Sequence, residues 1–297
     1  MWIEITVAAA FFQNLRSALQ KRLKAQLSTT GATFVRFGFG LPFALIYLLM
    51  LESFGFKTPA ANIVFAGYVV FAAIAQIAGT ALLVLAFSYR NFMAATVYSK
   101  TEPIIAALFG FLIIGDRLST VGIWAIVIGL AGVLLLSFGG TGSIRQIIKP
   151  SAMPSAVIGL SSGVGFAFSA IGVRGAALAL ENAELVVSAA MTLVCVISLQ
   201  TVLMTGFMLA FERHTIGAIA RNWRVSLLAG FCGAAASIGW FTAMAMQPVA
   251  LVKTVGQSEL LFAYAASLWW FRETISRTEL MGCGLVLLSV LLLIQFG

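Results

Sequence analysis

Apolar residues occur in long runs along the whole chain, and short polar segments separate one run from the next. A transmembrane α-helix needs about 20 mostly apolar residues, because each residue adds about 1.5 Å along the helix axis. Ten stretches fit this requirement, so we expect an all-α integral membrane protein with ten transmembrane helices. The predicted spans cover residues 2–22, 30–51, 62–87, 92–114, 119–139, 153–179, 184–211, 224–246, 249–271 and 277–296.

The longest interior connection divides the chain near its middle. It reads GGTGSIRQIIKPSAMP over residues 139–154, and its glycine, serine and proline content is typical of a linker. The division predicts a first five-helix repeat over residues 1–139, a linker over 140–152 and a second five-helix repeat over 153–297.

The two halves align with each other. When residues 86–138 are shifted by 157 positions they match 243–295 without gaps, and nine of the 53 positions are identical. The shift superimposes Glu102 on Glu259, each within a predicted span. Because each half has five helices, an odd number, the second half enters the membrane in the opposite orientation. Inverted repeats are typical of secondary transporters, which bind substrate near the membrane midplane between the repeats.

Composition and charge support a membrane location. The chain is 61% hydrophobic and 9% charged, whereas soluble domains contain about 25% charged residues. The net charge of +8 does not indicate a nucleic-acid partner, because the basic residues cluster in the loops. Alternate loops carry eleven and two of them, so the positive-inside rule predicts a cell inner membrane location with both termini outside. The eleven are Lys21, Arg22, Lys24, Arg90, Arg145, Lys149, Arg213, Arg221, Arg224, Arg272 and Arg277, and the two are Lys57 and Arg117.

The sequence contains little that predicts enzyme chemistry. Cys195, Cys232 and Cys283 fall in apolar runs without metal-ligand spacing, and the one histidine, His214, lies in a polar loop. The chain has neither an H-E-x-x-H nor a G-x-S-x-G motif. We therefore expect no metal, no cofactor and no catalytic residues, and an integral membrane lipid enzyme stays only a remote alternative.

Two segments resemble a known family. Residues 101–119, TEPIIAALFGFLIIGDRLS, are repeated as residues 258–276, SELLFAYAASLWWFRETIS. Each ends with an acidic residue, a polar or basic residue, an aliphatic residue and a serine. This pattern resembles the EamA-type repeat of the drug/metabolite transporter superfamily. The resemblance covers nearly the whole chain and implies ten helices in two five-helix repeats around a central cavity, lined largely by the third and fourth helices of each half.

Several charged residues lie inside the predicted spans. A charge at the centre of a transmembrane helix costs about 2.5–3.5 kcal/mol on insertion scales, so such residues usually face a protein interior or a water-filled cavity. Five are basic and two are acidic, which favours a substrate with a negatively charged group. They are Arg16, Arg36, Lys100, Glu102, Arg174, Lys253 and Glu259.

Helical spacing arranges polar residues of the fourth helix of each half. Residues four apart stack on one face, which aligns Thr96 with Lys100 and Lys253 with Gln257. The 157-residue shift superimposes these two pairs, so each repeat has the same polar stripe with the lysine in the opposite position. We expect this stripe to face substrate. Lys100 and Glu102 are two residues apart and point to opposite sides, so the glutamates are expected off the stripe, toward neighbouring helices.

Further candidates lie on other helices, and their roles stay open. Gln13 shares one face of the first span with Arg16. Tyr98, which stacks with Glu102, and Trp240, deep in the eighth span, are candidate substrate contacts. The remaining arginines either extend toward lipid headgroups or pair with the glutamates. Glu102 and Glu259 either brace the helix bundle or carry a coupling proton.

Together these features predict a secondary active transporter that moves a small polar metabolite by alternating access, in export or exchange. The basic residues favour an anionic or zwitterionic substrate, such as an amino acid or organic acid. Export of amphiphilic or cationic compounds, as in drug efflux, is the alternative. The partners expected are the small-molecule substrate, the lipid bilayer and a proton or counter-substrate. The sequence does not distinguish a monomer from a homodimer.

Overall fold

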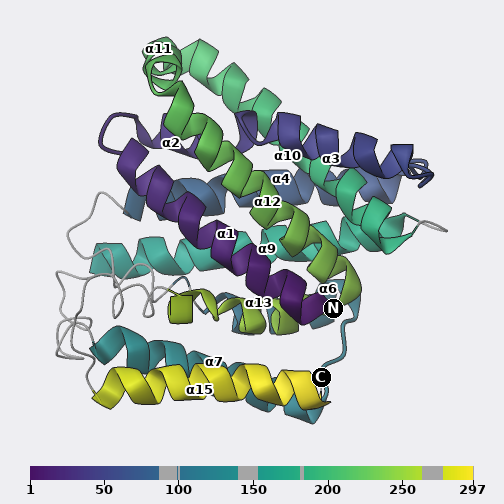
Figure 1. Cartoon of the computed structure of the whole chain (residues 1–297), viewed down its shortest axis with the longest axis vertical. Coiled ribbons are helices and arrows are strands. Elements are labelled where there is room, and N and C mark those ends of the chain that lie inside the picture. Colours follow the sequence, from purple (N-terminus) through teal and green to yellow (C-terminus); the bar gives the residue numbers. More distant parts are fainter. Residues whose placement is uncertain (87–98, 100, 140–152, 181–183, 263–276, 297) are drawn as a thin grey trace.

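The structure is a computed structural model of the chain, and it describes residues 1–86, 99, 101–139, 153–180, 184–262 and 277–296. The described residues form helices and turns and contain no strand, which confirms the all-α prediction (Figure 1). The helices are α1 (Trp2–Leu23), α2 (Thr29–Gly38), α3 (Leu41–Ser53), α4 (Ile63–Ala86), α6 (Glu102–Ile114), α7 (Thr120–Gly139), α9 (Met153–Ala179), α10 (Leu185–Phe211), α11 (Arg213–Arg221), α12 (Trp223–Met246), α13 (Val249–Gly256) and α15 (Arg277–Phe296).

Five stretches of the described residues are long and apolar enough to cross a membrane. Three shorter apolar helices lie within α6, α7 and α15. These elements coincide with predicted spans, while the full count of ten stays a prediction. The five are Thr29–Ser53, Ile63–Leu85, Val157–Ala179, Leu185–Phe211 and Trp223–Met246.

The second predicted span is divided. Residues 30–51 were expected as one helix, but α2 ends at Gly38 and α3 begins at Leu41. Pro42 is the second residue of α3. Proline has no N–H to donate to the carbonyl four residues earlier, and its ring clashes with that carbonyl, which explains the interruption.

The fourth helix of each half also changes at its middle. In the second half, α13 ends at Gly256, residues 257–258 form a turn, and residues 259–262 are helical again. In the first half Thr101 lies in a turn and α6 begins at Glu102. The 157-residue shift superimposes 101 on 258, so both interruptions occur at equivalent positions.

A short amphipathic helix, α11, occupies what was expected to be a polar loop. Its Thr215 and Ile219 are buried, whereas His214 is exposed. Glu212, just before α11, accepts hydrogen bonds from the hydroxyl groups of Ser28, Thr30 and Thr215 at 2.9, 2.8 and 3.1 Å. Partial burial raises the pKa of Glu212, but these hydrogen bonds outweigh it, and the net pKa is lowered from its ordinary value of 4.5. Glu212 thereby joins the start of α2 to the junction of α10 and α11.

Three helix pairs pack along much of their length: α1 with α12, α4 with α9, and α7 with α15. Small residues allow the close approach: a Cβ atom on Gly165 of α9 would lie 2.9 Å from the Cα atom of Gly79 on α4. Figure 1 shows α7 and α15 side by side at one edge of the molecule and α11 at the opposite edge. The N- and C-termini lie at the same end of the bundle (Figure 1), and which side of the membrane this end faces stays a prediction.

Candidate functional site

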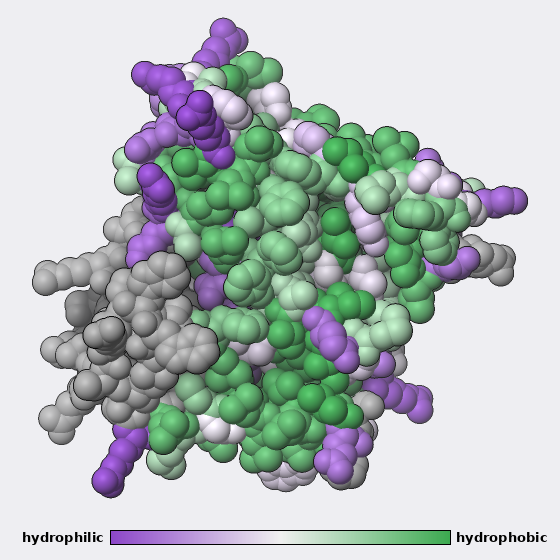
Figure 2. Space-filling model, viewed as in Figure 1, coloured by the Kyte–Doolittle hydropathy of each residue, from purple (hydrophilic) through white to green (hydrophobic). Residues whose placement is uncertain are grey.

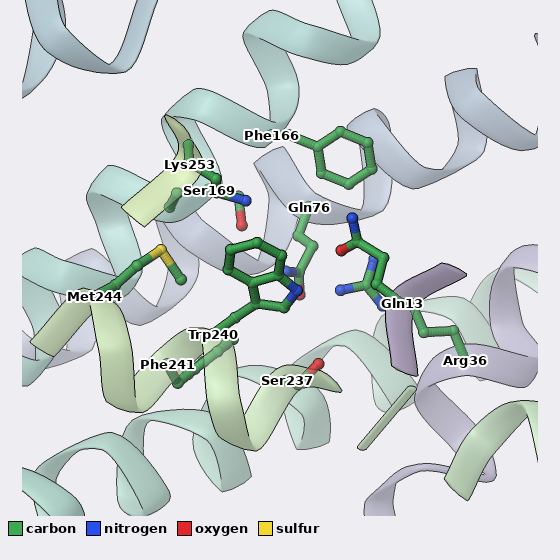
Figure 3. Close-up of a pocket in the computed structure, with 11 residues that line it drawn as sticks. Gln13, Arg36, Gln76, Phe166, Ser169, Ser237, Trp240, Phe241, Met244 and Lys253 are labelled. Carbon is green, nitrogen blue, oxygen red and sulfur yellow. The ribbon is translucent and has the colours of Figure 1, made fainter. Parts of the chain in front are cut away.

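Two adjoining cavities lie in the middle of the bundle, and they share Gln13, Trp240 and Lys253 in their walls. Together with the open space at their mouths they contain about 340 and 280 Å³ of empty space, and little of it is wide enough for a water-sized molecule. Residues of α1, α2, α4, α9, α12 and α13 line the first cavity (Figure 3). The second is lined by Gln13, Glu102, Pro103, Trp240, Lys253, Gly256, Gln257 and Glu259.

Lys253 lies where the two cavities meet. Its Nζ atom is 2.8 Å from Oε1 of Glu102 on α6 and 4.5 Å from the centroid of the Trp240 ring. Both charged side chains are largely buried. Within the described part of the chain, Glu102 is the charged partner of the Lys253 ammonium, and the Trp240 ring faces the same group. An ammonium has three N–H groups, and the described residues supply no second acceptor for them.

Trp240 forms the wall between the cavities. A Cβ atom on Gly256 would lie 2.3 Å from the Cη2 atom of the Trp240 ring, so the ring packs directly on the backbone at the end of α13. Its Nε1–H is buried and has no acceptor among the described residues. In Figure 3 the ring lies at the centre of the view, with Lys253 on one side and Gln13 and Arg36 on the other.

Arg36 supplies a second positive charge to the first cavity. The side chain is buried, and its Nη1 donates a hydrogen bond to the hydroxyl group of Thr80 on α4 at 3.0 Å. Arg16 of α1 lies nearby, because both arginines contact the space beside Gly233 of α12. Two of the Arg16 nitrogens, Nε and Nη1, have no hydrogen-bond partner among the described residues. The first cavity is therefore in an electropositive region.

Glu259 brings a carboxylate to the second cavity. Gln13 of α1 donates a hydrogen bond from Nε2 to the Glu259 carboxylate at 2.8 Å. Asn14 donates a longer one, 3.4 Å, to the Glu259 main-chain carbonyl. Glu102 and Glu259 each occupy the first position of a helical segment after a turn. The partial positive charge at a helix N-terminus stabilises a carboxylate there.

The turn before Glu259 changes the hydrogen bonding of the helix. The N–H groups of Gln257, Ser258, Leu260 and Leu261 each bond to the carbonyl three residues earlier. A stretch of this tighter pattern inside a helix often marks a hinge. The site is thus built around a point where the helix can bend.

Arg174 forms a separate cluster toward the end of the bundle that holds the termini. Its guanidinium makes a two-pronged contact with the Asp116 carboxylate, at 2.8–3.1 Å, and Nη1 donates to the main-chain carbonyl of Met244 at 2.8 Å. These contacts join α9, the loop after α6 and the end of α12. Arg174 thus pairs with an aspartate that the sequence analysis used only as a marker of the repeat.

The other candidate residues are placed as follows. Arg16 is enclosed by protein, with 2% of its surface exposed. The Gln257 side chain is buried, and its Oε1 lies 2.8 Å from where a Cβ atom of Gly129 on α7 would be, so it points toward α7. Lys100, Thr96 and Tyr98 lie outside the described residues, so the first-half stripe stays a prediction.

Glu102 was expected to lie off the polar stripe of its own helix, toward neighbouring helices. It contacts Lys253 on the neighbouring helix α13 and lines the second cavity. The Thr96–Lys100 stripe lies outside the described residues, so the position of Glu102 relative to it stays a prediction.

Three polar residues of the lining were not predicted from the sequence: Gln76, Ser169 and Ser237. Each is a polar residue inside an apolar helix, which was the available signal. Gln76 also accepts a hydrogen bond from Nε2 of Gln200 at 2.9 Å.

Comparison with known proteins agrees with this architecture. The model of the EamA-like transporter family matches residues 1–138. A crystal structure of a protein superimposes on 98% of this chain and 96% of its own, with a TM-score of 0.72 and 15% sequence identity. At that identity the likeness shows the fold alone. No curated protein sequence matches the chain. Residues 1–138 of this chain are therefore similar to the EamA-like transporter family.

Proposed function

We propose that the chain is a secondary active transporter that moves a small polar metabolite, anionic or zwitterionic, through the two central cavities by alternating access. The observation that carries this proposal is the burial and the charge pairing of Lys253. It is a largely buried ammonium at the junction of the cavities, and Glu102 is the one described residue that pairs with its three N–H groups.

The charge distribution supports an acidic group on the substrate. Among the described residues, the lining of the first cavity includes Arg36 and Lys253 and no carboxylate, while that of the second includes Glu102 and Glu259. Attraction between charges is stronger in a buried site than in water. A substrate carboxylate in the first cavity is therefore attracted to both cations. An ammonium group on the same molecule lies in the second cavity, near its carboxylates.

The helix contacts support two inverted repeats, with the boundaries 1–139, 140–152 and 153–297. If each helix is replaced by its counterpart in the other half, the α1–α12 contact becomes an α9–α4 contact, and both of these helix pairs pack together. The replacement likewise turns α1–α13 into α9–α6, and α2–α12 into α10–α4, and all of these contacts are present. Three other contacts join a helix to its own counterpart, so the replacement leaves them unchanged: α6–α13, α3–α10 and α7–α15. This is the pattern expected of a transporter whose two repeats move about a shared site.

Alternating access also accounts for the narrow cavities and for the Arg174 cluster. Little of the present cavity space is wide enough even for a water-sized molecule, so we expect the helices to separate when a metabolite enters. The cluster ties three segments together toward one end of the bundle. We take this as the closed end, with the tight turns at 101 and 257–258 as the hinges.

Binding is tested by a melting-temperature screen of the full chain in detergent, because a ligand that binds the folded state raises its stability. Anionic and zwitterionic metabolites are expected to raise the melting temperature of the wild type. Lys253→Gln is expected to weaken this binding by about tenfold or more, because a hydrogen bond to a charged group contributes about 1.5–3 kcal/mol. Lys57→Gln, in an exposed loop, is the matched control. Equal responses in wild type and Lys253→Gln would contradict the proposal.

A second candidate is export of amphiphilic cations. Glu102, Glu259 and the Trp240 ring together line the second cavity, and an aromatic face with carboxylates also suits a cation. In this case cationic ligands, rather than acids, raise the melting temperature, and Glu102→Gln with Glu259→Gln abolishes that response. The same two variants test proton coupling: uptake into liposomes driven by a pH gradient should be lost in one of them.

A further inference from the structure

An exposed groove lies on the outside of the bundle, away from the central cavities. It contains about 740 Å³ of empty space and shares no lining residue with either cavity. Its walls come from α3 and from the first half of α12, and they are apolar except at one end. The groove is lined by Phe43, Trp223, Arg224, Leu227, Leu228 and Phe231.

The apolar part follows one face of α12. Leu227, Leu228 and Phe231 lie three, four and seven residues after Arg224, the spacing of a single helix face. All three remain exposed, with 40–49% of their surface accessible. Phe43 of α3 meets Phe231 edge-on, with ring centroids 5.3 Å apart, and closes the floor of the groove. The result is an apolar channel along the helix axis, open to the surroundings.

One end of this channel is cationic and aromatic. The Arg224 guanidinium lies 5.5 Å from the centroid of the Trp223 ring, and both side chains are exposed. Arg224 makes no ion pair with a described residue. Arg221 ends α11 just before it and is also exposed. Figure 2 shows hydrophilic residues gathered over α11, next to an apolar surface. Tryptophan and arginine at the end of a membrane helix are typical of the headgroup region.

We propose that this groove binds an anionic phospholipid of the surrounding bilayer. The phosphate lies against Arg224, and one acyl chain lies along Leu227, Leu228 and Phe231. Arg221 adds a second cation, which favours a headgroup of net negative charge over a zwitterionic one whose ammonium it repels. A second copy of the chain is a poorer occupant, because a two-fold contact at this face brings Arg224 of each copy toward the other. The inference does not depend on the proposed transport activity.

The test compares two lipids on the full chain. The protein is delipidated in detergent and mixed with equal amounts of phosphatidylglycerol and phosphatidylcholine carrying the same acyl chains, and bound lipid is counted by native mass spectrometry. We expect phosphatidylglycerol to be preferred about fivefold, the factor for one basic residue near a lipid surface. Arg221→Gln should bring the ratio of the two lipids close to one, and Arg224→Gln should weaken the binding of both lipids, because both carry the phosphate.

Two further variants make the result specific. Arg277→Gln removes an equally exposed charge at the start of α15, a helix that does not border the groove, and should keep the wild-type ratio. Leu228→Trp fills the groove and should reduce binding of both lipids. The proposal is overturned if Arg221→Gln keeps the preference, if Arg224→Gln leaves the binding of both lipids unchanged, if Arg277→Gln loses the preference equally, or if the groove variants change only the fraction of protein that forms dimers.

Discussion

Lys253 lies between two partners of different kinds, the Glu102 carboxylate and the face of the Trp240 ring. The described residues supply no second acceptor for its three N–H groups, so we expect an acidic group of a substrate to compete with Glu102 by charge and to accept the hydrogen bonds that remain. We therefore expect Lys253 to be held by Glu102 and Trp240 without substrate and to gain further contacts when an acidic group binds.

The ion pair itself gives a prediction at the same scale. Lys253→Met leaves the Glu102 carboxylate without its partner in a largely buried site, and we expect a loss of about 3 kcal/mol in unfolding free energy. Adding Glu102→Gln should recover part of this loss, because no charge then stays uncompensated. Unfolding of the single and double variants, followed by tryptophan fluorescence in detergent, measures the coupling. Strictly additive losses would show that the two side chains do not interact.

Individual elements show how far the sequence predicts this molecule. Apolar runs locate α4, α9, α10, α12 and α15 to within a few residues, because length and hydropathy decide where a helix can cross a membrane. The interruptions were harder to predict. Pro42 marks the break between α2 and α3. The turn at Gln257 and Ser258 has no such marker, because neither glutamine nor serine is excluded from a helix.

Part of the candidate site was predictable, because polar or aromatic residues deep in apolar spans stand out in the sequence. Lys253, Trp240 and Gln13 were found as polar or aromatic residues deep in apolar spans, and all three line the cavities. The Glu102–Lys253 pair was missed because it joins residues 151 positions apart across two helices. Periodicity relates residues on one helix and says nothing of such pairings.

The junction of α2, α10 and α11 depends on pH. The Glu212 carboxylate accepts three hydroxyl hydrogen bonds, and its pKa is lowered from 4.5. A lowered carboxyl pKa contributes stability that is fully present above the ordinary value and is lost as pH falls through the folded-state value. The melting temperature of wild type should therefore exceed that of Glu212→Gln at pH 7, and the gap should close below about pH 4.5. A gap that is constant down to pH 3 would contradict this assignment.

At the scale of the whole molecule, we expect the Arg174 cluster to oppose the proposed movement of the two halves. Arg174 belongs to α9, Asp116 follows α6, and Met244 lies near the end of α12. The two-pronged ion pair therefore joins elements from both proposed repeats. Rearrangement of the bundle for access from this end requires that the pair separate.

Opening can be followed by the reactivity of a cavity residue. Ser169 lines the first cavity and is 2% exposed. A Ser169→Cys reporter, with the three native cysteines changed to alanine, should react slowly with a water-soluble maleimide. Arg174→Gln should raise the rate about tenfold, the factor expected for loss of charged hydrogen bonds. Arg117→Gln, an exposed neighbour of Asp116, is the control and should not change the rate. Equal rates in all three proteins would show that the cluster does not close the cavity.

The most direct test of the central claim is exchange transport in proteoliposomes. Liposomes are loaded with the unlabelled acid or zwitterion that most raises the melting temperature, and uptake of the labelled compound is measured. The account predicts saturable uptake that exceeds protein-free liposomes, falls about tenfold or more in Lys253→Gln, and is retained in Lys57→Gln. Uptake no greater than in protein-free liposomes, or equal uptake by wild type and Lys253→Gln, would contradict it.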